Sequence, residues 1–165
     1  MLDQEKFFNT YKVQEAFEDS GLSWDTLEKI YDDYKSRLPE MKKMADHLQE
    51  EISKEIDFHV HSIHNRCKNP EHLIEKIIRK VGVEKRQKYK SINEKNYLRI
   101  VRDLMGVRIL ILSKEEWRTV HDFLLKVDED PRYDICMAEM PRAYICYGDR
   151  DIFNYTIHKE YTDKG

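Results

Sequence analysis

Residues 69–82, NPEHLIEKIIRKVG, constrain the fold more than any other stretch, because the start, the buried face and the end of a helix can be read from them. Asn69 is a good N-cap, Pro70 suits the first helical position, and Gly82 is a natural stop. Five apolar residues recur at helical spacing. They are Leu73, Ile74, Ile77, Ile78 and Val81. The sequence therefore predicts an amphipathic helix from about 70 to 81, with its apolar side packed on a sheet.

The polar side of this predicted helix is basic. His72, Lys76 and Arg79 fall on one stripe at about 100° per residue. Arg66 and Lys68 precede the helix at alternate positions, so an extended backbone sends both side chains the same way. Several cations near a helix N-terminus can bind a polyphosphate, so one interpretation of these residues is a phosphate site. The alternative interpretation is an ordinary solvated helix face.

This concentration of positive charge is local. The 165-residue chain has 29 basic and 32 acidic residues and a net charge of -3, which does not suggest general coating of nucleic acid, since that function needs a clearly basic domain. No apolar run approaches the roughly 20 residues of a membrane span, and the N-terminus lacks a signal pattern. Three cysteines without CxxC spacing, Cys67, Cys136 and Cys146, predict reduced thiols. We expect a cytoplasmic protein without a membrane partner.

Residues 1–55 predict an N-terminal helical segment. Residues 4 to about 20 are expected to form one short helix. Ser23 is the predicted N-cap of a second helix that begins near Trp24. Pro39 is expected to kink or split that helix.

Residues 56–165 predict an α/β domain with a mixed β-sheet flanked by helices. IDFHVHSIH (56–64) alternates like a strand, and its His59 and His61 raise the alternative of a metal pair. Residues 83–96 are polar and predict a loop. MGVRILIL (105–112) is an apolar run that predicts a buried strand.

The remaining elements complete this α/β pattern. YLRIVRD (97–103) predicts a short helical segment, and Ser113 a cap for a helix over 114–127. Strand-like stretches then follow. They are YDICMAEM (133–140), RAYICYG (142–148) and DIFNYTI (151–157).

Asp103 and Arg108 frame the start of the predicted buried strand. A carboxylate at a strand entrance, near a phosphate-binding helix, is a natural Mg²⁺ ligand. An arginine within an apolar strand is costly unless it is paired. The alternative is a structural ion pair of Asp103 with Arg102 or Arg108.

RCKNPEHLIEKIIRK and DLMGVR together resemble the synthetase domain of the RelA/SpoT family of alarmone synthetases. The resemblance covers about residues 55–165, and His72 stands where the family usually has Ser. The matching positions are Arg66, Lys68, Lys76 and Arg79 in the first motif, and Asp103, Gly106 and Arg108 in the second.

The resemblance implies a nucleotidyltransferase-like synthetase domain in residues 56–165 and an ATP-dependent pyrophosphokinase. The β,γ-pyrophosphate of ATP would move to the ribose 3′ hydroxyl of GDP or GTP, which makes the (p)ppGpp alarmones of the stringent response. Asp103 would bind the cofactor Mg²⁺ and act in catalysis with Lys76. The residues implied to hold ATP and its phosphates are Arg66, Lys68, His72, Lys76, Arg79 and Arg108.

The acceptor side of the family pattern is only partly matched. In FNYTIHKEYTDKG, Asn154 replaces the family's Asp, Tyr155 matches its Tyr, and Lys159 or Lys164 stands for its Lys. The family's later E-x-Q-x-R strand is absent. We therefore expect a chain truncated at its acceptor side, which holds ATP poorly or is inactive.

Two alternatives remain open at this stage. Toxic small members of the family transfer pyrophosphate to the 3′ CCA end of tRNA, and EKRQKYK (84–90) is a candidate basic surface for tRNA. The second alternative is an inactive nucleotide-binding or regulatory module, neutralised by an antitoxin-like partner protein. The sequence is compatible with an oligomer.

Overall fold

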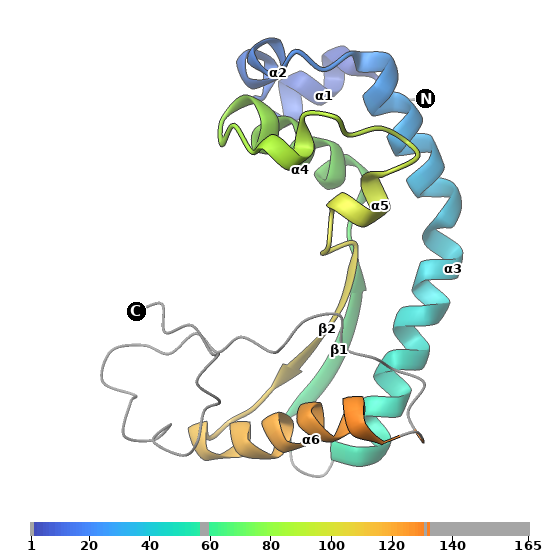
Figure 1. The fold of residues 1–165 in the computed structure, drawn as a ribbon, viewed down its shortest axis with the longest axis vertical. Coiled ribbons are helices and arrows are strands. Elements are labelled where there is room, and N and C mark those ends of the chain that lie inside the picture. The colour runs from blue at the N-terminus through green and yellow to red at the C-terminus, as the bar shows by residue number, and fades with distance from the viewer. Residues whose placement is uncertain (1, 57–59, 131, 133–165) are drawn as a thin grey trace. The chain divides into compact units, whose positions relative to one another are not determined.

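The computed structural model of the chain describes residues 2–56, 60–130 and 132 (Figure 1). These residues combine helices with a two-stranded sheet of β1 and β2, which confirms the predicted α/β class. The predicted strands over 133–157 lie outside the described residues. The elements are α1 (Gln4–Tyr11), α2 (Gln14–Ser20), α3 (Trp24–Ile56), β1 (Ser62–Cys67), α4 (Pro70–Gly82), the 3₁₀ helix η2 (Gln87–Tyr89), α5 (Tyr97–Ile100), β2 (Met105–Leu110), the 3₁₀ helix η3 (Lys114–Glu116) and α6 (Trp117–Glu129).

The chain divides into two compact units. The first comprises Met1–Leu48 and Asn65–Arg108, and the second comprises Gln49–His64 and Ile109–Gly165. The largest fully buried side chains belong to the first unit, and they come from α3, α4, α5 and the residue after α5. They are Leu27, Ile30, Tyr34, Leu73, Ile74, Ile77, Ile78, Tyr97 and Val101.

The prediction of one helix over residues 4–20 is wrong. Lys12 adopts a left-handed conformation with a φ of 55° and separates α1 from α2. Asp3 caps α1, because its side chain accepts a 2.9 Å hydrogen bond from the backbone N–H of Lys6. The break was not visible in the sequence, since a lysine is not the residue expected at a left-handed position.

The predicted start of α3 is confirmed. Of the two effects expected of Pro39, a kink or a split, the split is wrong. The Oγ atom of Ser23 accepts a hydrogen bond of 3.2 Å from the N–H of Thr26. The helix then continues through Pro39. Tyr34 before the proline and Ala45 after it are fully buried, so packing on both sides outweighs the loss of one backbone hydrogen bond.

The first strand begins later than predicted. Ile56 is the last residue of α3, and β1 begins only at Ser62. His59, half of the alternative metal pair, lies outside the described residues. β1 and β2 are antiparallel. The N–H of His61 donates to the carbonyl of Leu110, and the N–H of Lys68 donates to the carbonyl of Leu104; each N···O distance is 2.8 Å.

The second strand is present but is not buried as predicted. Arg108 is exposed on β2, and Leu110 and Leu112 are 42% and 78% exposed. Within the part of the chain that the structure describes, β1 is the strand paired with β2. An apolar run of this kind is typical of strands enclosed on both faces, and the exposure of Leu110 and Leu112 shows that this end of the run is not enclosed in that way.

The segment between α4 and α5, predicted as a polar loop, is anchored in the core. It contains η2, and Tyr89 and Ile92 are each 3% exposed. The cap predicted at Ser113 is confirmed, since Ser113 and Glu116 form a capping box before α6. Among the described helices, none is sufficiently long and apolar to cross a membrane.

Candidate functional site: a cationic cluster around Asp103

The helix α4 sets the position of the site. Its predicted N-cap is confirmed, because Oδ1 of Asn69 accepts hydrogen bonds from the N–H groups of Glu71 and His72, over 2.8 and 3.2 Å. The predicted apolar face is buried, since its five residues are at most 2% exposed: Leu73, Ile74, Ile77, Ile78 and Val81. The predicted packing of this face on a sheet is wrong, because among the described residues its core cluster includes residues of α1 and α3, such as Phe7, Leu27 and Ile30, and none of β1 or β2. With that face buried, the basic residues of α4 are directed to its other side.

Lys68 and Lys76 converge on Asp103. The Nζ atom of Lys68 lies 3.2 Å from Oδ2 of Asp103, and that of Lys76 lies 2.5 Å from Oδ1. The two lysine side chains are 18% and 16% exposed, and the carboxylate is 44% exposed. Each oxygen of Asp103 therefore faces its own ammonium group, and the set remains open to solvent.

The charge state of Asp103 follows from this geometry. Partial burial raises the pKa of its carboxyl group. The hydrogen bonds from Lys76 and Lys68 lower this pKa, and their combined effect is larger than that of burial. The net pKa is below the ordinary value of 3.8, so Asp103 is an anion at neutral pH. The cluster then has one negative and two positive charges, and it can attract a further anion.

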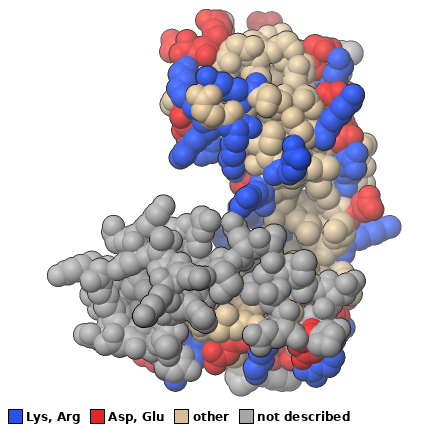
Figure 2. All heavy atoms as spheres, viewed as in Figure 1, with Lys and Arg blue, Asp and Glu red and all other residues tan. Residues whose placement is uncertain are grey.

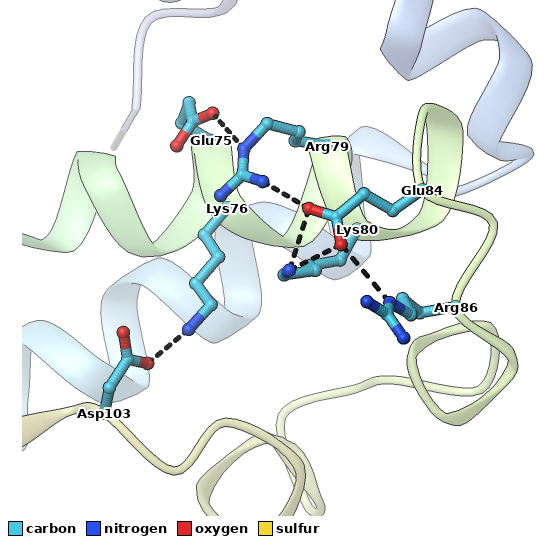
Figure 3. Close-up of polar contacts among 7 residues, drawn as sticks. All are labelled: Glu75, Lys76, Arg79, Lys80, Glu84, Arg86 and Asp103. Carbon is cyan, nitrogen blue, oxygen red and sulfur yellow. Dashed lines mark hydrogen bonds and ion pairs between the residues drawn. The ribbon is translucent and has the colours of Figure 1, made fainter. Parts of the chain in front are cut away.

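Arg79 does not join this set, although the sequence placed it on the same stripe as Lys76. Its guanidinium pairs with Glu75 over 3.1 Å and with Glu84 (Figure 3). The helix geometry was predicted correctly. However, the long and flexible side chain of Arg79 reaches carboxylates near it on α4 and in the segment that follows.

Glu84, which sequence reasoning missed, is the centre of a second cluster. Its carboxylate accepts hydrogen bonds from Lys80 over 2.6 and 2.7 Å and from Arg86 over 3.2 Å, in addition to that from Arg79 (Figure 3). These contacts lower the pKa of Glu84, with the hydrogen bond from Lys80 as the main cause. The sequence indicates this cluster only through the spacing of Lys80 and Glu84, which are four residues apart, as ion pairs along a helix commonly are.

The other predicted phosphate ligands lie apart from these carboxylates. Arg66 on β1 and Arg108 on β2 have exposed side chains without an ion pair to a described residue. The imidazole of His72 makes an edge contact with the ring of Tyr11, with centroids 5.6 Å apart. Tyr155, Lys159 and Lys164 lie outside the described residues.

Lys and Arg side chains gather over α4 and the segment that follows it in the space-filling view (Figure 2). The EKRQKYK segment, proposed above as a surface for tRNA, contributes cations here but no exposed aromatic ring. Tyr89 is only 3% exposed, and Lys88 lies over its ring at 5.2 Å from the centroid. Stacking of an RNA base on this tyrosine is therefore excluded in the described conformation.

The fit of Mg²⁺ depends on Asp103. Across residues 2–56, 60–130 and 132, no three His, Cys, Asp or Glu side chains gather as a ready-made metal group. Mg²⁺ is commonly held by one or two carboxylates together with substrate phosphates and water. The half-exposed Asp103 carboxylate, beside two lysines that can bind phosphate, fits that mode of binding.

Comparisons with models of protein families, with curated proteins and with solved structures found no match to this chain.

Proposed function

We propose that this chain is an ATP-dependent pyrophosphokinase of the RelA/SpoT type, with a nucleotidyltransferase-like synthetase domain in residues 56–165. The observation that carries the proposal is the convergence of Lys68 and Lys76 on Asp103. A carboxylate flanked by two ammonium groups matches the charges of a Mg²⁺–polyphosphate, in which metal and phosphate oxygens alternate.

In this proposal the ion pairs of the free chain exchange for contacts with the nucleotide. Lys68 and Lys76 turn from Asp103 to phosphate oxygens of ATP, and Asp103 holds Mg²⁺. The metal, when bound, neutralises phosphate charge. Arg66, Arg79, His72 and Arg108 are the proposed additional contacts, and Arg79 must first leave Glu84.

The reaction proposed is a transfer of the intact pyrophosphoryl group. The ribose 3′ oxygen of GDP or GTP forms a bond to the β-phosphorus of ATP. The bond from that phosphorus to the oxygen bridging the α- and β-phosphates breaks, AMP leaves, and the 3′ hydroxyl releases its proton. Lysines placed at the phosphates stabilise the charge that develops on them. Tyr155 with Lys159 or Lys164 is the proposed acceptor side.

The donor site is tested by Mg-ATP binding to the full chain, measured by isothermal titration calorimetry. We expect Lys76→Ala to weaken binding by at least about tenfold, since it removes a charge-assisted contact to phosphate. Lys43→Ala is the matched control, because Lys43 is an exposed lysine on α3. Equal affinities in the two variants would instead identify the basic face of α4 as an ordinary solvated surface.

The acceptor is tested separately with ATP labelled in the γ-phosphate. Transfer of label to GDP or GTP supports alarmone synthesis. Transfer to the 3′ end of tRNA identifies the toxic type of acceptor. If the chain binds Mg-ATP and label reaches neither acceptor, it is an inactive nucleotide-binding module, for which an antitoxin-like partner would be sought.

A further inference from the structure

A buried tyrosine hydroxyl contacts the backbone next to Asp103 and at Lys68. Tyr34, on α3, is fully buried, and its Oη atom lies 2.8 Å from the carbonyl oxygen of Lys68 and 3.1 Å from that of Leu104. Burial is the main cause that raises the pKa of this hydroxyl to about 12, so it remains a hydrogen-bond donor at neutral pH. The hydroxyl proton is thus shared between two backbone carbonyls.

These two carbonyls belong to the backbone that carries the cluster. Lys68 is itself one of the paired lysines, and Leu104 directly follows Asp103 in the chain. The two segments also contact each other, since the N–H of Lys68 donates to the carbonyl of Leu104 over 2.8 Å. One hydroxyl therefore ties together the chain that leaves β1 and the chain that enters β2.

The separation in sequence makes this tie important. Lys68 and Asp103 are 35 residues apart, so no local structure fixes the distance between their side chains. An ion pair that is partly open to solvent holds its partners weakly by itself. A buried hydrogen bond to both backbones fixes the points from which the two side chains start.

We propose that Tyr34 is a positioning residue: its hydroxyl holds the backbones of Lys68 and Leu104 so that the Lys68 and Asp103 side chains meet. The consequence for Mg-ATP rests on the function proposed above, because there the same two side chains receive the phosphates and Mg²⁺. Displacement of such groups by about 1 Å can cost up to 100-fold in reactivity, so a fixed backbone is required.

Tyr97 provides a matched control in the same core. It is fully buried, and its ring makes an edge contact with that of Tyr34, with centroids 6.3 Å apart. Its hydroxyl donates instead to Oδ2 of Asp33 over 2.7 Å, away from the Asp103 cluster. Tyr34→Phe and Tyr97→Phe therefore remove the same group from neighbouring rings, but only the first acts on the site.

The experiment compares the full chain with these two variants by NMR of ¹⁵N-labelled lysine ammonium groups, with the signal of Lys68 assigned by Lys68→Arg. Thermal unfolding is recorded for each variant. We expect Tyr34→Phe to shift the Lys68 ammonium signal and to accelerate its hydrogen exchange. Tyr97→Phe should leave this signal unchanged even if it lowers the melting temperature equally. Mg-ATP affinity should fall roughly tenfold in Tyr34→Phe alone.

Two results would overturn the positioning role of Tyr34. One is an unchanged Lys68 signal in Tyr34→Phe, and the other is an equal change in Tyr97→Phe, which would indicate a general loss of core packing. Failure of the proposed function has a different signature: the wild-type chain does not bind Mg-ATP, while the Lys68 signal still responds to Tyr34→Phe. That result retains Tyr34 as the positioning residue of the Lys68–Asp103 pair.

Discussion

Gly82, in the last turn of α4, lies against the backbone of Ala16 in α2 so closely that a Cβ atom at position 82 would overlap the Ala16 carbonyl oxygen. Its φ is not positive; among the described glycines only Gly21 has that conformation. The sequence predicted the end of the helix at Gly82 correctly, but the reason is different. The glycine permits close approach of two helices rather than a left-handed cap.

Gly82→Ala is therefore expected to destabilise the chain. The overlap involves backbone atoms, which cannot move aside as a side chain would, so we expect a loss of about 2–3 kcal/mol in the free energy of unfolding. Denaturant unfolding monitored by circular dichroism measures this change. Gly106→Ala is the control, because a Cβ atom there would meet nothing within 4 Å. A loss of the same size in both variants would contradict the packing argument.

Glu84→Gln is expected to strengthen the binding of Mg-ATP. In the free chain the Glu84 carboxylate accepts a hydrogen bond from Arg79, which is a proposed contact for ATP, and so competes with phosphate for this guanidinium. Glutamine keeps the size of the side chain but removes its charge. We expect an affinity gain of about three- to tenfold, measured by calorimetry at low ionic strength, where charge effects are largest.

Glu40→Gln serves as the control for the general effect of lost negative charge, since Glu40 is exposed on α3. Its affinity for Mg-ATP should stay close to that of the wild type. Weaker binding in Glu84→Gln would show that Glu84 holds the cations in place rather than competing for them. Repeating the titration at higher salt should reduce the gain.

The features that the sequence predicted well are local. Asn69 lies next to the helix that it caps, and the apolar spacing of α4 needs only its own residues. Ser113 with its capping box is a further case. Such patterns are complete within one or two helical turns, so they survive whatever the rest of the chain does.

The features that it missed depend on contacts between distant residues. Tyr34 contacts Leu104 across 70 positions, and Tyr11 donates to Glu71 across 60. Nothing near either tyrosine indicates its partner. Asp103 was predicted as a site residue because it precedes a strand. Its ion pairs with Lys68 and Lys76 could not be predicted, because they depend on how α4 packs near the start of β2. The alternative interpretation, an ion pair of Asp103 with Arg108, is wrong for the same reason, since Asp103 pairs with Lys68 and Lys76.

Acid should weaken the contribution of Asp103 to stability. The folded-state pKa of its carboxyl is lowered below 3.8, so its stabilisation is present above that value and is lost as the pH falls through the folded-state pKa. We expect Asp103→Asn to be less stable than the wild type at pH 7, and the difference to shrink below about pH 4. Unfolding in urea between pH 3 and 7 measures it, and a constant difference would exclude this linkage.

Alkali should release the link between α1 and α4. The hydroxyl of Tyr11 donates a 2.9 Å hydrogen bond to Oε2 of Glu71, and burial followed by this bond raises its pKa from 10.0 to about 12. A raised pKa means that the stabilisation is complete below pH 10 and is lost as the pH rises toward 12. Tyr11→Phe keeps the ring contact with His72 but removes the bond, so it should cost about 1 kcal/mol at pH 7. This cost should decrease above pH 10, as measured by urea unfolding at pH 7, 9 and 11. A cost that increases with pH would mean that the hydroxyl is not the donor in this contact.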